Sequence, residues 1–417
     1  MPTPRGDRTA SVPTGTRLLH IGMPKTGTTA LQTTASRQRD ALVAHGVRYP
    51  GDDINHRRAL LAKLGVVWGW GEGAAVPGMR PWHELEREIS GGDTSRIWLD
   101  HEFCATARRE SAAQLIDALG GPVHVVVTFR PIPAYVASAW QQYLKSGLSI
   151  DLDTWMHRVL DGWPALDDAT PSFGRRIDYA GVVEKWASLV GPENVTAIVL
   201  DPADRSVVSE TFEDLLELPR GMLDSDARTD AFSLNRGFSW EEAEVMLRLN
   251  QAIERGGGLP WPEYSRTVRH GVVNRLLTHH AVGADERRVL VPRWAADRAS
   301  EIARGQLERI RASGIAIVGD LDLIAAQGET AELERPSLVP AAVADDAVSG
   351  AVSAAAGRGW TFEAWPEQGK DPAKDEARVR ESLRGIRTRR LVQEIARRVA
   401  AAARQRRDAI RRATRRR

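Results

Sequence analysis

One short segment, GMPKTGTT at residues 22–29, combines glycine, lysine and threonine in a way that could bind an anion. Glycine lets a backbone turn tightly, and the first N–H groups of a helix have no partner within that helix. Lys25 can add a positive charge, and the hydroxyls of Thr28 and Thr29 can donate hydrogen bonds. The pattern predicts a phosphate-binding loop. Its plainer alternative is a strand–helix turn that binds nothing.

Two neighbouring segments must position this loop. The apolar run RLLHIG (17–22) is typical of a short buried strand, and residues from about 28 to 45 favour a helix. The order resembles a P-loop, but Thr28 stands where the pattern G-x-x-x-x-G-K-[ST] has its lysine, and Lys25 lies three residues earlier. This departure opposes an ordinary nucleotide kinase or NTPase, which remains the alternative enzyme.

A second segment, TFRPIPAYVASAWQQYLKSG, follows an apolar strand and places Arg130 and Ser138 eight residues apart. Together with HIGMPKTGTTALQ it resembles the cofactor-binding motifs of sulfotransferases that use 3′-phosphoadenosine 5′-phosphosulfate (PAPS), most closely the bacterial carbohydrate-type members. The resemblance covers roughly 17–320 and implies PAPS as co-substrate and adenosine 3′,5′-bisphosphate as product. It also implies that Arg130 and Ser138 hold the 3′-phosphate. The implied loop for the 5′-phosphosulfate consists of Pro24, Lys25, Thr26, Gly27, Thr28 and Thr29.

The resemblance implies an in-line transfer in which Lys25 stabilises the leaving phosphate and the sulfuryl group. No metal is required in principle. Two departures, Pro131 after the arginine and Trp140 after the serine, concern the adenine side and remove no phosphate donor. The strand VHVVVTF (123–129) ends in Arg130 rather than in the acidic residue that an ATPase would want. A scaffold that binds nucleotide without turnover is the non-enzyme alternative.

An acceptor hydroxyl needs a general base. The predicted strand RIWLDHEF (96–103) ends in acidic and histidine side chains, at the edge where open α/β sheets place their sites. We favour Glu102 as the base and take His56 as its rival. Alternation along a strand would turn His101 to the opposite face and place Asp100 on the face of Glu102.

The acceptor is predicted to be a carbohydrate, a glycolipid or a related metabolite. Three tryptophans, Trp68, Trp70 and Trp82, lie in or near an irregular segment (52–80) after His56. Their rings could stack on a sugar, although packing in the core is the commoner use of tryptophan. Arg236 is a further candidate for covering the cofactor, with an ordinary loop arginine as its alternative.

The order of short apolar strands and helices indicates an α/β protein with a parallel sheet covered on both faces. We predict a P-loop-like three-layer fold with a C-terminal basic helical extension. The predicted strands lie at 17–22, 47–51, 96–103, 123–129 and 194–200, and a helical region follows from 239 to about 313. The predicted divisions are a flexible leader (1–16), the sulfotransferase domain (17–325), a linker (326–373) and a basic helical tail (374–417).

The formal net charge of +2 over 417 residues hides an uneven distribution. Residues 381–417 hold 14 arginines and three acidic side chains, a net charge of +11, so the rest carries −9. This tail could contact an anionic membrane, or form a structural or disordered extension, and nucleic acid is the less favoured partner.

Composition limits the classes of protein. The single cysteine, Cys104, excludes a disulfide framework and sites with several cysteine ligands. No run of 18 apolar residues occurs, and the first residues lack the apolar core of a secretory signal. We therefore expect a cytoplasmic bacterial protein, with peripheral contact at the inner face of the membrane as an option for the tail.

Overall fold

A six-stranded parallel sheet organises the chain. In this computed structural model, residues 10–91, 95–204, 206–224 and 236–356 are described. The strand order is β2-β3-β1-β4-β5-β6, and every neighbouring pair is parallel. The strands are β1 (Arg17–His20), β2 (Val47–Arg48), β3 (Arg96–Asp100), β4 (Val123–Phe129), β5 (Val195–Val199) and β6 (Ala316–Val318).

Sixteen α-helices are found among the described residues. Those of the first half are α1 (Thr28–Arg37), α2 (Arg39–Ala44), α3 (Arg57–Leu64), α4 (Arg80–Ile89), α5 (Arg109–Leu119), α6 (Ile132–Leu144), α7 (Leu152–Met156) and α8 (Pro171–Ile177). The others are α9 (Tyr179–Val190), α10 (Val207–Leu216), α11 (Trp240–Arg255), α12 (Trp261–Tyr264), α13 (Asn274–His279), α14 (Arg293–Arg304), α15 (Leu307–Ala312) and α16 (Ala341–Ala355). A 3₁₀ turn, η1 (Glu102–Thr106), and a π-helical segment, η5 (Ser265–Val273), matter for the site.

Alternate residues of β1, β3, β4 and β5 supply two separate hydrophobic cores, which confirms the predicted three layers. Leu18 and Val126 pack in one core with residues of α1, α2 and α10. Leu19 and Val125, one position away, pack in the larger core with α3, α5, α6 and α9. Because successive side chains of a strand point to opposite faces, this division follows from the strand sequences.

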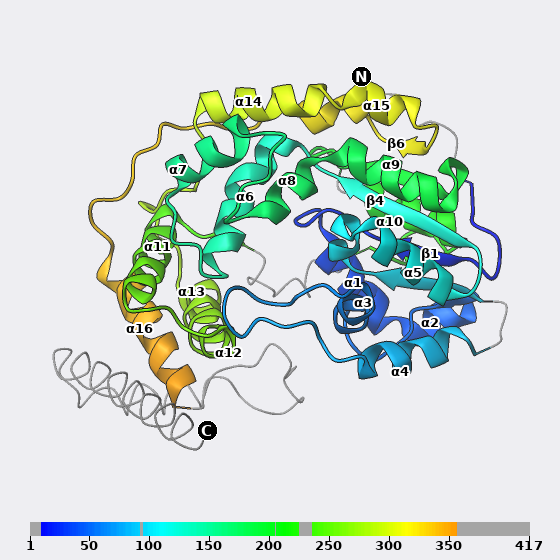
Figure 1. The fold of residues 1–417 in the computed structure, drawn as a ribbon, viewed down its shortest axis with the longest axis horizontal. Coiled ribbons are helices and arrows are strands. Elements are labelled where there is room, and N and C mark those ends of the chain that lie inside the picture. Colours follow the sequence, from blue (N-terminus) through cyan, green and yellow to red (C-terminus); the bar gives the residue numbers. More distant parts are fainter. Residues whose placement is uncertain (1–9, 92–94, 205, 225–235, 357–417) are drawn as a thin grey trace, which may run out of the picture. The chain divides into compact units, whose positions relative to one another are not determined.

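The larger core extends well beyond the sheet. Figure 1 shows α11, α12, α13 and α16 gathered on one side of the described part of the chain and the strands on the other. The segment between α3 and α4 reaches across to α12, where the Trp261 N–H donates to the Glu72 carbonyl oxygen at 2.6 Å. The α3–α4 segment and α12, almost 200 residues apart in sequence, therefore lie side by side.

The order of most elements agrees with the sequence-based expectation, with several differences. The predicted helix from 28 to 45 is two helices, α1 and α2, which meet at Gln38. The strand predicted at 96–103 ends at Asp100. Strand β6, a partly exposed edge strand, was not predicted, because its three residues are too few to show a period.

Residues 341–355, predicted to lie in a linker, form helix α16. Its sequence is rich in Ala, Gly and Ser, yet the buried residues Val343, Ala347, Gly350 and Ala354 recur at helical spacing. The helix packs closely on η5, where a Cβ atom added to Gly350 would lie 2.5 Å from the Gly271 carbonyl oxygen. Small residues on both helices permit this approach.

The predicted leader is partly packed on the domain. Val12 is 3% exposed, its N–H donates to the Leu215 carbonyl oxygen at 2.9 Å, and its own carbonyl accepts from Arg96 Nε at 2.7 Å. Residues 1–9 and the predicted basic tail (374–417) lie outside the described residues. None of the described helices is long and apolar enough to cross a membrane.

Candidate functional site

The backbone of the predicted phosphate loop takes a conformation that most residues avoid. Lys25 has φ 68°, and Gly27, at the start of α1, has φ 80°. Among the described residues other than glycine, Lys25 and Glu217 have positive φ. A lysine in the left-handed region is strained, so its surroundings must hold it there.

Contacts with the end of β4 hold the loop in place. The Met23 N–H donates to the Thr128 carbonyl oxygen at 3.1 Å. The Thr26 hydroxyl donates to the Met23 carbonyl at 2.7 Å and lies 2.8 Å from the Thr128 hydroxyl. A Cβ atom at Gly22 would come within 2.5 Å of that same hydroxyl oxygen, so only glycine fits there.

A buried polar network lies beneath the loop. His20 Nδ1 is 2.8 Å from Asp100 Oδ2, and Gln32 Nε2 donates to Asp100 Oδ1 at 2.7 Å. His20 Nε2 lies 3.4 Å from the Thr128 hydroxyl, which links the network to the loop. Both carboxylate oxygens of Asp100 are therefore engaged, and the side chain is fully buried. Asp100 positions the loop from below rather than facing a substrate.

This network also bears on the NTPase alternative. Strand β3 borders β1 and ends in Asp100, so a neighbouring strand does end in an acidic residue, although β4 does not. Asp100 is fully buried, and His20 and Gln32 each contact one of its carboxylate oxygens, so its surroundings suit a structural role better than binding a metal or an attacking water. Among the described residues, no group of three or more His, Cys, Asp or Glu side chains could hold a metal ion.

The start of α1 offers N–H groups to a ligand. Its N-cap, Gly27, has no side chain, and its first turn holds no acidic residue. No acceptor is found among the described residues for the N–H groups of Thr28 and Thr29. The Thr28 side chain is buried, the Thr29 side chain is exposed, and Pro24 is partly buried. The arrangement suits an oxyanion over the helix N-terminus.

Two cations flank this position without an acidic partner. Burial, together with the nearby charge of Arg130, lowers the pKa of Lys25 to about 8, while Glu102 acts in the opposite direction. Arg130 Nη1 donates to the Lys25 carbonyl at 2.8 Å. Among the described residues, neither cation forms an ion pair with a carboxylate. Two such positive charges favour binding of an anion.

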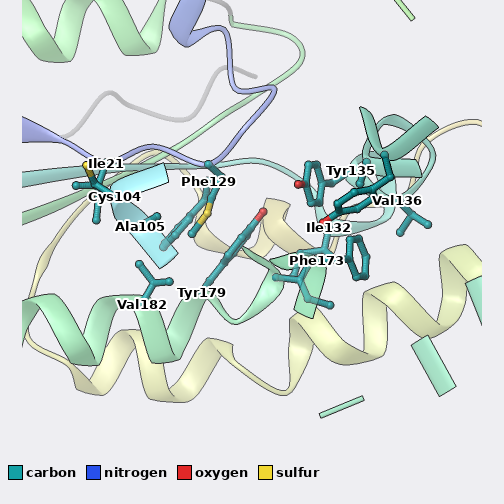
Figure 2. Packing of buried hydrophobic residues seen from close by; sticks show 14 of the residues in the cluster. Ile21, Cys104, Ala105, Phe129, Ile132, Tyr135, Val136, Phe173, Tyr179 and Val182 are labelled. Carbon is teal, nitrogen blue, oxygen red and sulfur yellow. The ribbon is translucent and has the colours of Figure 1, made fainter. Parts of the chain in front are cut away.

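Arg130 is held by its surroundings yet retains unused hydrogen-bonding capacity. Its Nη2 donates to the Ala134 carbonyl at 3.1 Å, and its own carbonyl accepts from the Tyr179 hydroxyl at 3.0 Å. Figure 2 shows Tyr179 beside Phe129, the residue before Arg130, and the two rings stack at 4.3 Å. The Arg130 Nε atom is buried with no partner. An unsatisfied buried donor is costly unless a ligand accepts from it.

Ser138 lies on the second turn of α6, one turn after Ala134. It is partly buried, and its hydroxyl donates to the Tyr135 carbonyl at 3.0 Å. The Arg130 guanidinium is bonded to the preceding turn of the same helix. The two predicted 3′-phosphate ligands therefore belong to one strand–helix junction. Ser138 would have to release Tyr135 in order to donate to a phosphate.

Glu102 and His101 do not lie on opposite faces as predicted. The chain leaves the strand after Asp100, and η1 begins at Glu102, so strand alternation does not apply. His101 Nε2 lies 3.8 Å from Glu102 Oε2, and His101 Nδ1 accepts from the Phe103 N–H at 3.1 Å. The Glu102 side chain is 24% exposed, whereas that of His101 is 3% exposed. Glu102 is the accessible member of the pair.

His56, the rival base, is fully committed to the backbone. Its Nδ1 accepts from the Asp100 N–H at 3.0 Å, and its Nε2 lies 2.9 Å from the Pro50 carbonyl oxygen. Burial lowers the pKa of His56 to about 4. In this arrangement neither ring nitrogen is open to a substrate proton, so the structure gives His56 a positioning role.

Arg236 is also committed elsewhere. Its guanidinium makes two 2.6 Å bonds to the Glu242 carboxylate and a third to the Leu276 carbonyl. Glu242 in turn accepts from the Ser239 N–H at 2.8 Å and completes the capping box of α11. Arg236 therefore stabilises a helix start and, as placed here, does not point its charge at a cofactor.

The three tryptophans proposed for sugar stacking have different surroundings. Trp82 is 1% exposed and belongs to the core, so it cannot contact a ligand. Trp70 is partly buried and packs against Tyr143, with ring centroids 5.7 Å apart. Trp68 is partly buried beneath two guanidinium groups. Cys104 is fully buried, and burial raises the pKa of its thiol, which agrees with an inert core residue.

Several residues near the site were missed by sequence reasoning. His20 and Thr128 each lie near the end of an apolar strand, and a polar residue at that position was the available signal. Arg176 and Arg269 come from helices far along the chain, and no motif marks them. A cavity of about 550 Å³ between α8 and α14 is lined by none of the predicted site residues.

Comparison with known proteins gives one likeness in fold. The structure resembles a crystal structure of a sulfotransferase from Alicyclobacillus acidocaldarius at 11% sequence identity, with a TM-score of 0.39. The match covers 72% of this chain and 95% of that chain. No protein-family model and no curated protein matches the sequence. At this identity the likeness concerns the fold alone.

Proposed function

We propose that this protein transfers the sulfuryl group of PAPS to an acceptor hydroxyl. The observation that carries the proposal is the pair Lys25 and Arg130, two cations beside a helix N-terminus with a buried, unpartnered Nε atom and no acidic partner among the described residues. Lys25 supplies the charge in the loop. Arg130 and Ser138 lie at the next strand–helix junction, where a second phosphate of the same nucleotide would bind.

The chemistry assigned to each residue follows from its position. Lys25 and the N–H groups of Thr28 and Thr29 hold the 5′-phosphosulfate and stabilise charge on the leaving phosphate oxygen. Glu102 takes the proton of the acceptor hydroxyl, whose oxygen forms a bond to sulfur as the bond between sulfur and the bridging phosphate oxygen breaks. The products are a sulfate ester and adenosine 3′,5′-bisphosphate.

The alternatives fit the site less well. A kinase or NTPase places its lysine on the first turn of the helix, where this chain has Thr28, and uses a free acidic residue, whereas Asp100 is buried and doubly bonded. A scaffold without chemistry would not need a strained lysine or an accessible Glu102 beside it.

The test is transfer from radiolabelled PAPS to a panel of hydroxyl acceptors by the full chain. The proposal predicts a labelled sulfate ester with the wild type and none above background with Lys25→Ala. Transfer of the terminal phosphate of ATP instead would favour the kinase. Binding of PAPS with no turnover on any sugar, lipid or phenol would favour the scaffold.

A further inference from the structure

A second group of cations, distinct from Lys25 and Arg130, surrounds Trp68. The guanidinium carbon of Arg57, from α3, lies 4.4 Å from the centroid of the Trp68 ring. That of Arg269, from η5, lies 5.3 Å from the same ring. Cations over an indole ring are attracted by its negative face. The Trp68 ring could have stacked on a neutral sugar, but two positively charged guanidinium groups lie over it instead.

The same group continues to Phe103, the residue after the proposed base. The rings of Trp68 and Phe103 are 6.1 Å apart, and the guanidinium carbon of Arg176, from α8, is 4.9 Å from the Phe103 ring. We call Arg57, Trp68, Phe103, Arg176 and Arg269 the arginine–aromatic cluster. It adjoins Glu102 in sequence and in space, so a ligand bound there would lie beside the proposed base.

Within the cluster, the charge of Arg57 acts against that of Arg269, while the carboxylate of Glu102 acts on Arg176 and raises its pKa. Arg269 forms no ion pair among the described residues, and its Nη1 donates to the Ser146 hydroxyl at 3.3 Å. Burial and the charge of Arg57 lower the pKa of Arg269 to about 10. The buried Lys145 lies 4.5 Å from the Phe238 ring, and Lys25, Arg269 and Arg236 all act to lower its pKa. Gathering like charges in a partly buried place is unfavourable until an anion joins them.

Tertiary contacts fix the position of the segment that carries Trp68. The segment that contains Trp68 is tied to α12 by the bond from the Trp261 N–H to the Glu72 carbonyl, and the rings of Trp68 and Trp261 meet edge to face at 6.4 Å. A Cβ atom at Gly69 would lie 2.5 Å from the Trp261 ring, so glycine permits this contact. Figure 1 shows this crossing between the α3–α4 segment and α12.

We propose that the arginine–aromatic cluster binds a negatively charged group of the acceptor. The acceptor would then be an acidic sugar derivative, with a carboxylate or an ester phosphate or sulfate, rather than a neutral sugar. A planar guanidinium can form two parallel hydrogen bonds to the oxygens of such a group, a bidentate geometry. The neighbouring aromatic rings shield these hydrogen bonds from water. That the anionic group belongs to the acceptor rests on the proposed function, whereas binding of the anion does not.

The test is calorimetry of the full chain with three probes that differ in one group. 4-Nitrophenyl β-glucoside is neutral, the matching β-glucuronide carries a carboxylate, and the glucoside 6-phosphate carries a phosphate. We expect one or both anionic probes to bind at least about tenfold more tightly than the neutral probe, since a charge-assisted hydrogen bond is worth that factor or more. The preferred anion identifies the charged group.

Variants assign the preference to the cluster. Arg269→Gln should remove most of the preference for the anionic probe, and Arg269→Lys, which keeps the charge, should retain part of it. Arg309→Gln is the matched control, because Arg309 pairs with Glu184 on α9 away from the cluster. Thermal unfolding of each variant shows whether the fold is intact.

Equal affinity for the neutral and charged probes, or binding of none of them, would overturn the proposal. So would weaker binding of adenosine 3′,5′-bisphosphate to Arg269→Gln, because the cluster would then serve the donor. If the wild type prefers the anionic probe but binds no adenosine 3′,5′-bisphosphate, the proposed function fails while the anion site stands.

Discussion

The predicted phosphate loop (residues 22–29) and the arginine–aromatic cluster are built in opposite ways. The loop comes from one continuous segment, 22–29, and rests on a buried network in which His20, Asp100 and Thr128 all have partners. The cluster brings together partly exposed side chains from α3, η1, α8 and η5, three of them arginines that lie over aromatic rings. Under the proposed function, the loop that binds the 5′-phosphosulfate is thus contiguous in sequence, whereas the proposed acceptor site depends on tertiary packing.

Removal of the Lys25 charge should have the largest effect. Lys25→Ala deletes a stabiliser of the leaving group, and loss of one preorganised donor typically costs a factor of about 10²–10³ in rate. We expect sulfuryl transfer to fall by roughly that factor or more, measured in single turnovers with saturating PAPS. Anionic probes should bind to the cluster unchanged.

Lys25→Gly is the matched control for this variant. Glycine adopts the φ of 68° freely, so the variant should unfold at an equal or higher temperature, with a gain of roughly 1 kcal/mol, while transfer is lost. Loss of stability together with activity would instead mean that Lys25 is structural, and the proposed division between loop and cluster would be weakened.

The choice between the two candidate bases gives the next largest effect. Glu102→Gln keeps the size of the side chain but cannot accept the proton, so the rate should fall by about 10²-fold or more. His56→Ala should mainly lower stability, by about 1–3 kcal/mol, because it leaves the Asp100 N–H unsatisfied. A rate loss larger for His56→Ala than for Glu102→Gln, at equal folded fraction, would reverse the assignment.

The pH dependence of kcat/KM for PAPS should report the protonation state of Lys25. Its pKa is lowered to about 8, mainly by burial, so raising the pH through 8 converts it to the neutral amine. kcat/KM for PAPS should therefore fall above about pH 8, by up to tenfold per unit. A bound anionic donor opposes this loss of charge, so kcat should decline only at higher pH. Lys25→Arg stays charged, so its kcat/KM should not fall above about pH 8. If the fall persists unchanged in this variant, another group causes it.

Disruption of the network beneath the loop should have a smaller effect. Thr128→Val removes the hydroxyl shared with Thr26 and His20 and should destabilise the protein by about 1–3 kcal/mol. We expect donor affinity to weaken by roughly tenfold as the loop loses its support, while preference for anionic probes stays as it was. An equal loss of donor affinity and of the preference for anionic probes would show that the loop and the arginine–aromatic cluster are not independent.

The contact between α16 and η5 gives the smallest predicted effect on the reaction. Gly350→Ala forces a methyl group against the Gly271 carbonyl oxygen and should destabilise the protein by about 1–3 kcal/mol. Because Arg269 belongs to η5, the preference for anionic probes should weaken by a few-fold while donor binding is unaffected. Denaturant unfolding and the probe titration measure the two effects.

The strand–loop–helix arrangement around residues 22–29 could be predicted from the sequence because its information is contiguous. Apolar strands, the loop of 22–29 and the spacing of Arg130 and Ser138 are all visible in short windows, and the three layers follow from them. The commitment of His56 to Asp100 and Pro50 was not visible, because backbone partners of a side chain depend on the fold.

The cluster could not be predicted for a different reason. Trp68 was recognised as a candidate, but the guanidinium groups above it come from positions 57 and 269, and no periodicity joins them. Helix α16 was hidden because its sequence of Ala, Gly and Ser is also typical of linkers. Arginine is so common in this chain that position alone marks no single one as functional.

The most direct test of the central claim is titration calorimetry with adenosine 3′,5′-bisphosphate and with ATP, using wild type and Arg130→Gln. We expect adenosine 3′,5′-bisphosphate to bind at least about a hundredfold more tightly than ATP, since two charge-assisted contacts are at stake. Most of this preference should disappear in Arg130→Gln, which removes the guanidinium with the unpartnered Nε atom. Equal or tighter binding of ATP by the wild type would contradict the central claim.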